Sequence, residues 1–384
     1  MPTVETKASS GSQVDKDTIE ASGVYALPYV LIYVLIPIIF LDHYNLTPIS
    51  PFFAPFFIFG IIPILDYVIG RDDYNPTKKV RKILENKISF QLVMMVWFPY
   101  YLALILWACW YGYPQSDSFA RKFSITLNVG LISGININMA HELIHKHPAV
   151  EQWLGRLCLC LTSYGHFAIE HLLGHHANVS THDDPASSRL NESLYAFLPR
   201  TIIGGFRSAF HLDAKTSSIL WVITFAFAFL CIPSGSIGFF FLQGFIGALL
   251  LEIINYIEHY GLSRLPEEPV TPMHSWNAGD RVTNYLLVKL QRHSDHHAFA
   301  GWRYQTLRSW PHSPQLPFGY ATMILIATVP PLFFKIMNPR VEQVKKYYAQ
   351  LEKEGKIEEI FTDEYLKEHP EDMKMAHWEK AKRS

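Results

Sequence analysis

Six long apolar stretches constrain the fold of this chain more than any other feature. A helix needs about 20 mostly apolar residues to cross the roughly 30 Å of hydrocarbon in a bilayer. Such stretches lie at 24–41, 51–69, 91–111, 123–140, 219–232 and 237–256, and the fifth of them is the shortest. We therefore expect an all-α membrane protein, built on a bundle of six transmembrane helices.

The composition agrees with a membrane protein and excludes one class of partner. Hydrophobic residues make up 49% of the 384 residues and charged residues 17%, which is more apolar than an ordinary soluble protein. The formal net charge of −1 argues against a nucleic acid partner, because neutralising phosphates requires a strong basic excess. The four cysteines form no C-x-x-C pair and are predicted to be buried thiols: Cys109, Cys158, Cys160 and Cys231.

Charges between the apolar stretches predict the orientation of the chain. The loop at 71–86 carries four Lys and Arg residues between positions 78 and 82, so the positive-inside rule places this loop in the cytosol. Two basic residues at 121–122 lie on the opposite side and weaken the assignment. With an even number of spans, both termini are expected in the cytosol, and the protein is expected in the inner membrane if the chain is bacterial.

Three parts of the chain are predicted from these patterns. They are a polar cytosolic N-terminus at 1–23 without a signal peptide, a transmembrane catalytic domain at 24–338, and a charged C-terminal tail at 339–384. A seventh apolar run at 318–337 is interrupted by Pro330-Pro331. We expect this run to be interfacial or re-entrant, because a full span would export the basic tail.

Nine of the 18 histidines are gathered just beyond the apolar stretches. They are His141 and His145, then His171, His175 and His176, then His259, and finally His293, His296 and His297. Spacings of i, i+3 and i+4 place side chains on one helical face, so each triplet is expected to converge on one volume. Because all nine follow the fourth and sixth stretches, they fall on one side of the membrane. We predict a cytosolic histidine-rich cap that binds two divalent ions, although imidazole ligands alone do not choose between iron, copper, zinc and nickel.

Two other functions share part of this pattern. The segment from His141 to His145 satisfies the H-E-x-x-H signature of zinc proteases, in which Glu142 would be the general base. A catalytic zinc takes three protein ligands and keeps one open position, so nine histidines exceed its need. A metal transporter would carry its histidines within the spans rather than after them.

The clustered residues resemble those of the integral-membrane alkane monooxygenases, within the larger class of histidine-rich membrane desaturases and hydroxylases. HELIHK at 141–146, HLLGHH at 171–176 and LQRHSDHH at 290–297 resemble the three histidine boxes of that class. NYIEHYGL at 255–262 resembles the additional box that separates alkane and xylene hydroxylases from desaturases, and Glu258 within it favours alkanes. The resemblance extends over residues 24–335.

This resemblance implies two non-haem irons held by the nine histidines, and terminal hydroxylation of medium-chain linear alkanes to primary alcohols with O2. Iron suits this reaction better than zinc, which has no redox chemistry. The chain has no cysteine quartet and no flavin or nicotinamide motif, so its electrons are expected from another protein. The resemblance implies that this partner is a rubredoxin served by rubredoxin reductase. The alternative is a diiron hydroxylase or desaturase of another lipophilic substrate, either xylene-type or fatty acyl.

Several acidic residues are candidates for tuning the site. Glu142, Glu258 and Asp295 flank predicted ligands and are expected to orient imidazoles by accepting their N–H protons. Asp183 and Asp184, beyond the second box, are similarly placed. The alternative for each is helix capping or solvent exposure.

Three phenylalanines of the second apolar stretch are candidates for the substrate channel. An alkane is expected to enter from the bilayer, because each buried CH2 contributes about 0.8 kcal/mol. Phe56, Phe57 and Phe59 would then form the far end of the channel. Their alternative role is ordinary packing or contact with lipid.

The remaining polar residues near the boxes receive simpler interpretations. Eight histidines lack the boxed spacing and are given no ligand role: His43, His147, His166, His211, His274, His312, His369 and His377. His182 stays ambiguous, and Glu252 is either functional or interfacial. Arg292 and Arg303 are candidates for docking an acidic rubredoxin or for contacting lipid phosphates.

Overall fold

The computed structural model describes residues 16–356. Within that part the chain forms helices joined by turns and loops and contains no β-strand, which confirms the all-α prediction. Five segments are long and apolar enough to cross a membrane: Thr18–His43, Ile88–Gly112, Phe119–Ile144, Leu194–Leu230 and Ile237–His259. The predicted stretch at 51–69 forms a shorter apolar segment, Phe53–Ile69. All six predicted stretches are therefore largely helical, whereas the number of six spans stays a prediction.

Several of these segments change helical type along their length. The first joins α1 (Lys16–Gly23), the 3₁₀-helix η1 (Leu27–Val34) and α2 (Leu35–His43). The second apolar segment joins α3 (Phe53–Phe56), the π-helix η2 (Phe57–Ile61) and α4 (Ile62–Ile69). Next come α6 (Ile88–Trp107) with the π-helix η3 (Ala108–Gly112), α7 (Phe119–Ile144), α11 (Leu194–Leu230) and α12 (Ile237–His259).

The short fifth stretch is the second half of α11, a helix of 37 residues. Its first half runs before Asp213, where the backbone is not helical (φ −152°, ψ 85°). The Asp213 carboxylate accepts a hydrogen bond from the Thr216 N–H (3.0 Å), as an N-cap does at the start of a new helix. The apolar run at 219–232 is therefore the continuation of a kinked helix rather than an isolated span.

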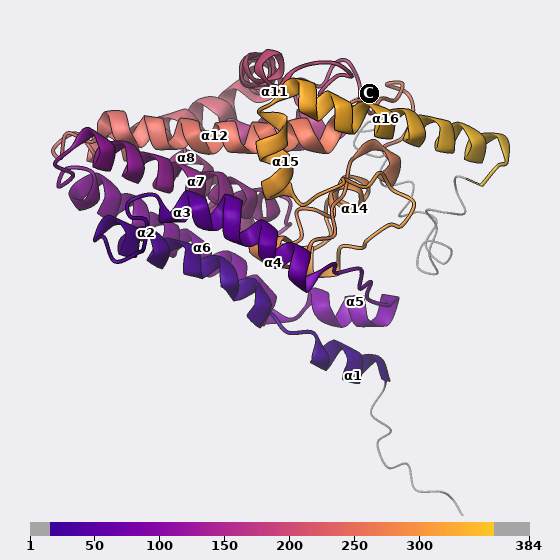
Figure 1. Cartoon of the computed structure of the whole chain (residues 1–384), viewed down its shortest axis with the longest axis horizontal. Coiled ribbons are helices and arrows are strands. Elements are labelled where there is room, and N and C mark those ends of the chain that lie inside the picture. Colours follow the sequence, from indigo (N-terminus) through magenta and orange to yellow (C-terminus); the bar gives the residue numbers. More distant parts are fainter. Residues whose placement is uncertain (1–15, 357–384) are drawn as a thin grey trace, which may run out of the picture.

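The centre of the bundle is the pair α7 and α12, which lie side by side along the molecule (Figure 1). Glycines allow this close approach. A Cβ at Gly134 would meet the Leu250 side chain at 2.6 Å, and one at Gly247 would meet Ser133 at 2.7 Å. Small residues at such contacts let helix backbones approach within a membrane, where dispersion forces drive packing. Because α7 and α12 both end in histidines, this contact brings two parts of the predicted site together.

A loop-rich region covers the carboxyl ends of α7 and α12. It contains α5 (Lys78–Glu85), α8 (Ala149–Leu161), α9 (Phe167–Ile169), the π-helix η4 (Glu170–His175), α10 (His176–Asn178), η5 (Pro272–His274), α13 (Arg281–Leu286), α14 (His293–Ala298) and η6 (Tyr304–Thr306). Arg292 joins distant segments of this region. Its guanidinium donates to the carbonyls of Tyr74 (2.8 Å) and Leu307 (2.6 Å) and forms an ion pair with Asp72 (3.2 Å). Arg292 is only 1% exposed, so the interpretation of this residue as part of a docking face was wrong.

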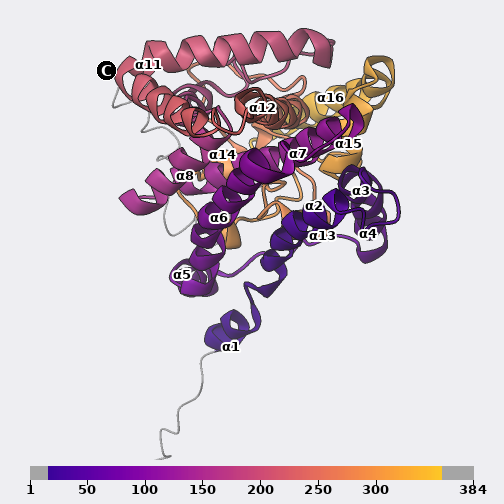
Figure 2. The same ribbon diagram turned by 90° about the vertical axis from the view of Figure 1, so that its left-hand side faces the viewer.

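The last two helices of the described part of the chain pack beside α12 (Figure 2). The predicted re-entrant run forms α15 (Tyr320–Ala327) and the beginning of α16 (Pro330–Lys353), which starts at the proline pair because proline fits the first turn of a helix. α16 continues without interruption across the predicted boundary between residues 338 and 339. His369 and His377 lie outside the described residues.

Candidate metal centre

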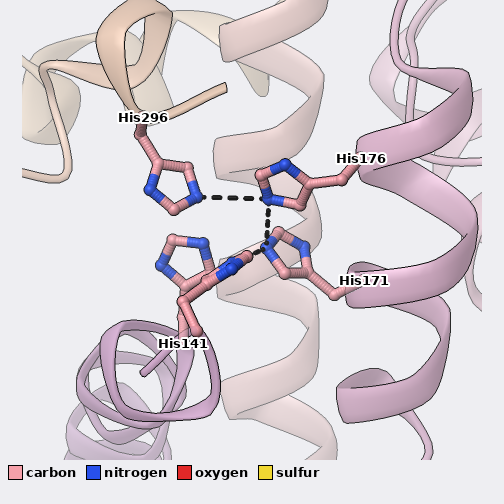
Figure 3. A group of neighbouring side chains, drawn as sticks. His141, His171, His176 and His296 are labelled. Atoms are coloured by element: carbon pink, nitrogen blue, oxygen red, sulfur yellow. Dashed lines mark hydrogen bonds between the residues drawn. The ribbon is translucent and has the colours of Figure 1, made fainter. Parts of the chain in front are cut away.

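Five elements bring the nine predicted ligands together. His141 lies in the last turn of α7, with His145 directly after the helix, and His259 is the last residue of α12. η4 and α10 carry the second box, and α14 carries the third. Figure 3 shows His141, His171, His176 and His296 turned toward one volume, from α7, η4, α10 and α14 respectively. The long-range packing therefore assembles all nine residues that the sequence singled out.

The rings divide into two groups, and within each group one nitrogen of every ring lies within 4.8 Å of the corresponding nitrogens of the others. One group contains five rings: His141, His145, His171, His176 and His296. The other contains four rings: His175, His259, His293 and His297. The expectation that each triplet converges on one volume was therefore wrong, because both the second and the third box supply rings to both groups.

A π-helical turn explains how the second box is divided. In η4 the N–H of His176 donates to the carbonyl of His171, five residues earlier, instead of four. This extra residue in the turn places the Nε2 atoms of His171 and His176 3.0 Å apart. It also turns His175 away from them, so that the Nε2 of His175 lies 3.3 Å from the Nε2 of His297. π-helical turns are rare and occur frequently at functional sites. The i, i+4 spacing would have paired His171 with His175, so α-helical reasoning gives the wrong partners here.

Distances between the ring nitrogens fit shared metal ions. The Nε2 atoms of neighbouring rings in the five-ring group lie 3.0 Å (His145 and His171) and 3.2 Å (His176 and His296) apart. In the four-ring group the Nε2 atoms of His293 and His297 lie 2.9 Å apart. Two nitrogen ligands at right angles, each about 2.1 Å from one ion, are about 3 Å apart. His141 Nε2 is buried without a hydrogen-bond partner in the described part of the chain, as a metal-binding lone pair should be.

The environment keeps these imidazoles in the form that binds metals. Burial, followed by the neighbouring rings, lowers the pKa of His171, His176 and His296 well below the usual value. The rings are therefore neutral at physiological pH, with one nitrogen free to donate a lone pair to an ion.

One acidic residue orients a histidine of the four-ring group in the predicted manner. Asp184 Oδ2 lies 2.9 Å from His175 Nδ1 and accepts from the Ser187 hydroxyl (2.6 Å), while Oδ1 accepts from the Ala186 N–H (2.9 Å). Because the carboxylate accepts from Nδ1–H, His175 presents Nε2 to the four-ring group.

Glu258 and Asp295 take different positions around the site. Glu258 Oε2 lies 3.1 Å from His293 Nε2, and its Oε1 accepts from the Tyr320 hydroxyl (2.6 Å). Asp295 instead accepts from the Arg308 guanidinium (2.8 Å) and the Trp310 indole N–H (2.7 Å). Asp295 therefore holds the loop after α14 against the third box, and its described hydrogen bonds include no imidazole.

Glu142 is occupied by structural contacts. It pairs with Lys146 (2.9 Å) and accepts from the Tyr304 N–H (3.0 Å), while the Lys146 ammonium donates to the Trp302 carbonyl (2.6 Å). These bonds tie the first box to the segment after the third box. They also leave Glu142 poorly placed to serve as the general base of a protease.

An apolar cavity lies between α2, η2, α4, α7, α12, α13 and α15. Its walls include Leu131, Leu250 and Phe59, and its polar lining residues include Asn138, Thr283 and Tyr320. Asn138 is one turn before His141 on α7, and Tyr320 donates to Glu258. Sequence reasoning missed Asn138 and Tyr320, although an Asn within an apolar span is a functional signal in itself.

The three candidate channel phenylalanines are placed differently from one another. Phe59 lines the cavity, whereas Phe56 and Phe57 do not, and Phe56 is 52% exposed on the outer surface. Neighbouring positions on one helix point in different directions, so three such residues cannot all face one cavity. Only Phe59 keeps its candidate role in the channel.

Other residues weighed from the sequence have structural roles or lie apart from the rings. Glu252 is buried and accepts hydrogen bonds from Tyr164 (2.8 Å) and Thr201 (2.7 Å). His182 and Asp183 are exposed, and His182 belongs to neither ring group. Arg303 forms a two-point ion pair with Glu151 (2.9 and 2.8 Å).

Apolar helices that end in two compact, largely buried groups of histidines define a histidine-rich integral membrane protein of the desaturase and hydroxylase class. The family model "Fatty acid desaturase" matches residues 121–327. Alkane 1-monooxygenase 2 of Alcanivorax borkumensis is 41% identical over 80% of this chain and 85% of its own length. Alkane 1-monooxygenase of Acinetobacter baylyi is 40% identical over 77% of this chain and 78% of its own length. The xylene/toluene monooxygenase hydroxylase component of Pseudomonas putida is 23% identical over 76% of this chain and 83% of its own length. The chain belongs to the alkane 1-monooxygenase family.

Proposed function

We propose that this protein hydroxylates the terminal carbon of medium-chain linear alkanes, using O2 and a pair of non-haem irons. The observation that carries the proposal is an apolar cavity lined by Asn138, one turn before His141, and by Tyr320, which donates to Glu258 next to His259 in sequence, close to two compact groups of imidazoles. Relatives named alkane 1-monooxygenases share 41% and 40% identity with the chain. The lower identity to the xylene/toluene hydroxylase component, 23%, favours linear alkanes over the aromatic alternative.

The chain's own residues would bind and orient the substrate. Leu131, Leu250 and Phe59 give the cavity walls that exclude water and hold a hydrocarbon chain without a charged group. Asn138 and Thr283 mark the polar part of the lining, and the Tyr320 hydroxyl is held by Glu258. A methyl group at this end would lie beside the rings, where the product alcohol gains a hydrogen-bond partner that the alkane lacks.

The five-ring and four-ring groups would each hold one iron, which when bound supplies the redox chemistry needed to attack an unactivated C–H bond. The overall reaction consumes an alkane, one O2, two electrons and two protons, and yields one primary alcohol and one water. Zinc cannot take part in this electron balance. The engagement of Glu142 with Lys146 and Tyr304 also removes support for the zinc protease alternative.

Electrons would come from a rubredoxin, itself reduced by rubredoxin reductase, that docks at a polar cleft beside the second box. The cleft is lined by residues of 180–190 and 261–268 and by Lys345, and Arg189 and Lys345 are exposed cations within it. Ser180 at the cleft donates to the His274 carbonyl (2.9 Å), which lies 3.3 Å from His259 Nδ1. Two hydrogen bonds thus connect the cleft with a ring of the four-ring group. Arg189, Arg264 and Lys345 outnumber Glu268 among the charged lining residues, and a cleft of net positive charge attracts an acidic carrier and raises its rate of association.

This docking site can be tested by charge reversal. Arg189→Glu combined with Lys345→Glu should raise KM for rubredoxin at least tenfold at low salt and leave turnover with a small chemical reductant unchanged. Lys335→Glu is the matched control, because Lys335 is exposed on the same helix and does not line the cleft. An unchanged KM in the double variant would exclude this cleft as the docking site.

The proposed activity requires a measurement on the purified membrane protein. Metal content and Mössbauer spectra should show two irons per chain, and reduced rubredoxin, O2 and octane should yield 1-octanol. Two irons without 1-octanol would reject alkane hydroxylation and direct the search to fatty acyl or xylene-type substrates. One zinc without O2 consumption would reject the oxygenase and restore the protease alternative.

A further inference from the structure

A second apolar hollow lies on the molecule, away from the histidine groups. It is a groove of about 720 Å³ between η1 and the first part of α6, within the range of about 300–1,000 Å³ typical of ligand sites. Leu27 and Val30 form one wall, and Leu92 and Val96 form the other. No predicted metal ligand lines this groove, so the proposed reaction does not account for it.

The mouth of the groove is positively charged. Lys87 and Ser89 lie there at the beginning of α6, where the helix dipole also favours an anion. The Lys87 ammonium donates to the carbonyls of Ala21 (3.1 Å) and Val24 (2.7 Å). An ammonium has three N–H donors, so these two bonds leave one donor for a ligand.

The length of the groove suits a hydrocarbon chain. Its lining on α6 runs from Lys87 to Tyr100, which at 1.5 Å per residue corresponds to about 20 Å. The opposite wall includes η1, a 3₁₀-helix of eight residues, and 3₁₀ runs longer than three or four residues are uncommon. A chain lying in the groove would cover the exposed apolar side of this segment, where Leu27 is 76% exposed.

We propose that this groove binds an anionic phospholipid, with one acyl chain between η1 and α6 and the phosphate at Lys87 and Ser89. A positive mouth above an apolar groove matches a molecule with an anionic head and a hydrocarbon tail. A neutral alkane has no charged or polar group that the Lys87 ammonium could bind. Occupation would also support the catalytic helices. Tyr33 of the groove packs against Trp97 (ring centroids 5.6 Å apart), and the Trp97 indole donates to Asn136 of α7 (3.0 Å).

The test uses the full-length protein reconstituted in vesicles of phosphatidylcholine containing phosphatidylglycerol, then extracted and examined by native mass spectrometry. The wild type should retain one phosphatidylglycerol at least fivefold more often than phosphatidylcholine, corrected for vesicle composition. Val96→Trp, which fills the groove, should lower the retained lipid at least fivefold. Val222→Trp is the matched control, because Val222 is 67% exposed on α11 outside the groove.

Lys87→Gln separates the two parts of the proposal. This variant should still retain lipid but bind phosphatidylglycerol and phosphatidylcholine equally. The proposal is overturned if the wild type shows no preference for the anionic lipid, or if Val96→Trp retains as much lipid as Val222→Trp. Thermal unfolding of each variant identifies a folding defect, and in that case Val96→Phe replaces Val96→Trp in the same comparison.

Discussion

Asp184 accepts a hydrogen bond from His175 across 2.9 Å, and this carboxylate comes from the loop that follows the second box. The bond fixes which nitrogen of His175 faces the four-ring group. Burial alone would raise the pKa of Asp184, but the contacts with His175 and Ser187 hold this pKa below its usual value. The carboxylate therefore stays ionised and continues to accept the hydrogen bond from His175.

Asp184→Asn should therefore lower the affinity of the four-ring group for metal by about 10- to 100-fold, the usual cost of losing an orienting partner. Iron retention during titration with a chelator measures this change. Asp183→Asn is the control, since Asp183 is the adjacent acid and is exposed. Equal iron retention in both variants would show that the hydrogen bond does not support metal binding.

Two histidines of the third box should control different irons. His293 belongs to the four-ring group and His296 to the five-ring group. Each alanine variant should retain about one iron, with complementary Mössbauer spectra, and lose activity on the order of 100-fold. His182→Ala should keep two irons, because His182 belongs to neither group. Identical spectra from the two single variants would contradict the division of the rings.

Substrate length should depend on Phe59 rather than on its exposed neighbour. Phe59→Leu removes ring volume from the cavity wall, and we expect the preferred alkane to lengthen by at least one carbon. Each added CH2 contributes about 0.8 kcal/mol, or about fourfold in kcat/KM. Phe56→Leu, outside the cavity, should leave the product profile unchanged. Competition assays with mixed alkanes measure both, and similar profiles for the two variants would remove Phe59 from the channel.

His166 should make the protein sensitive to acid. It is buried against Tyr164, Phe206 and Trp221, and burial lowers its pKa to about 4. A histidine with a folded pKa below its unfolded value of about 6.5 contributes stability that is present above pH 6.5 and is lost as pH falls toward 4.

Between pH 7.5 and pH 5 this loss amounts to about 2 kcal/mol. His166→Phe keeps an aromatic ring and removes the titration, so its stability relative to the wild type should improve by that amount over this interval. Denaturant unfolding in detergent at both pH values provides the measurement. Parallel losses of stability in the two proteins would show that His166 does not titrate on unfolding.

Apolar length was enough to predict the central helices. The predicted stretch at 123–140 lies within α7 and the one at 237–256 within α12, because a span must be long, apolar and satisfied by its own backbone bonds. The kink of α11 at Asp213 was not predicted, since it depends on a local cap rather than on hydrophobicity. The burial of Arg292 also escaped prediction, because its partners at Asp72 and Tyr74 are more than 200 positions away.

The sequence by itself determined the helices, the nine candidate ligands and the family, because spacing along a helix and residue chemistry are local properties. Only the tertiary structure decided which rings lie in one group, which acid orients His175 and which phenylalanine meets the cavity. These depend on a π-helical turn at 170–175 and on contacts between distant segments. A spacing of i, i+4 limits which side chains can meet, but the packing of α7, η4, α12 and α14 selects those that do.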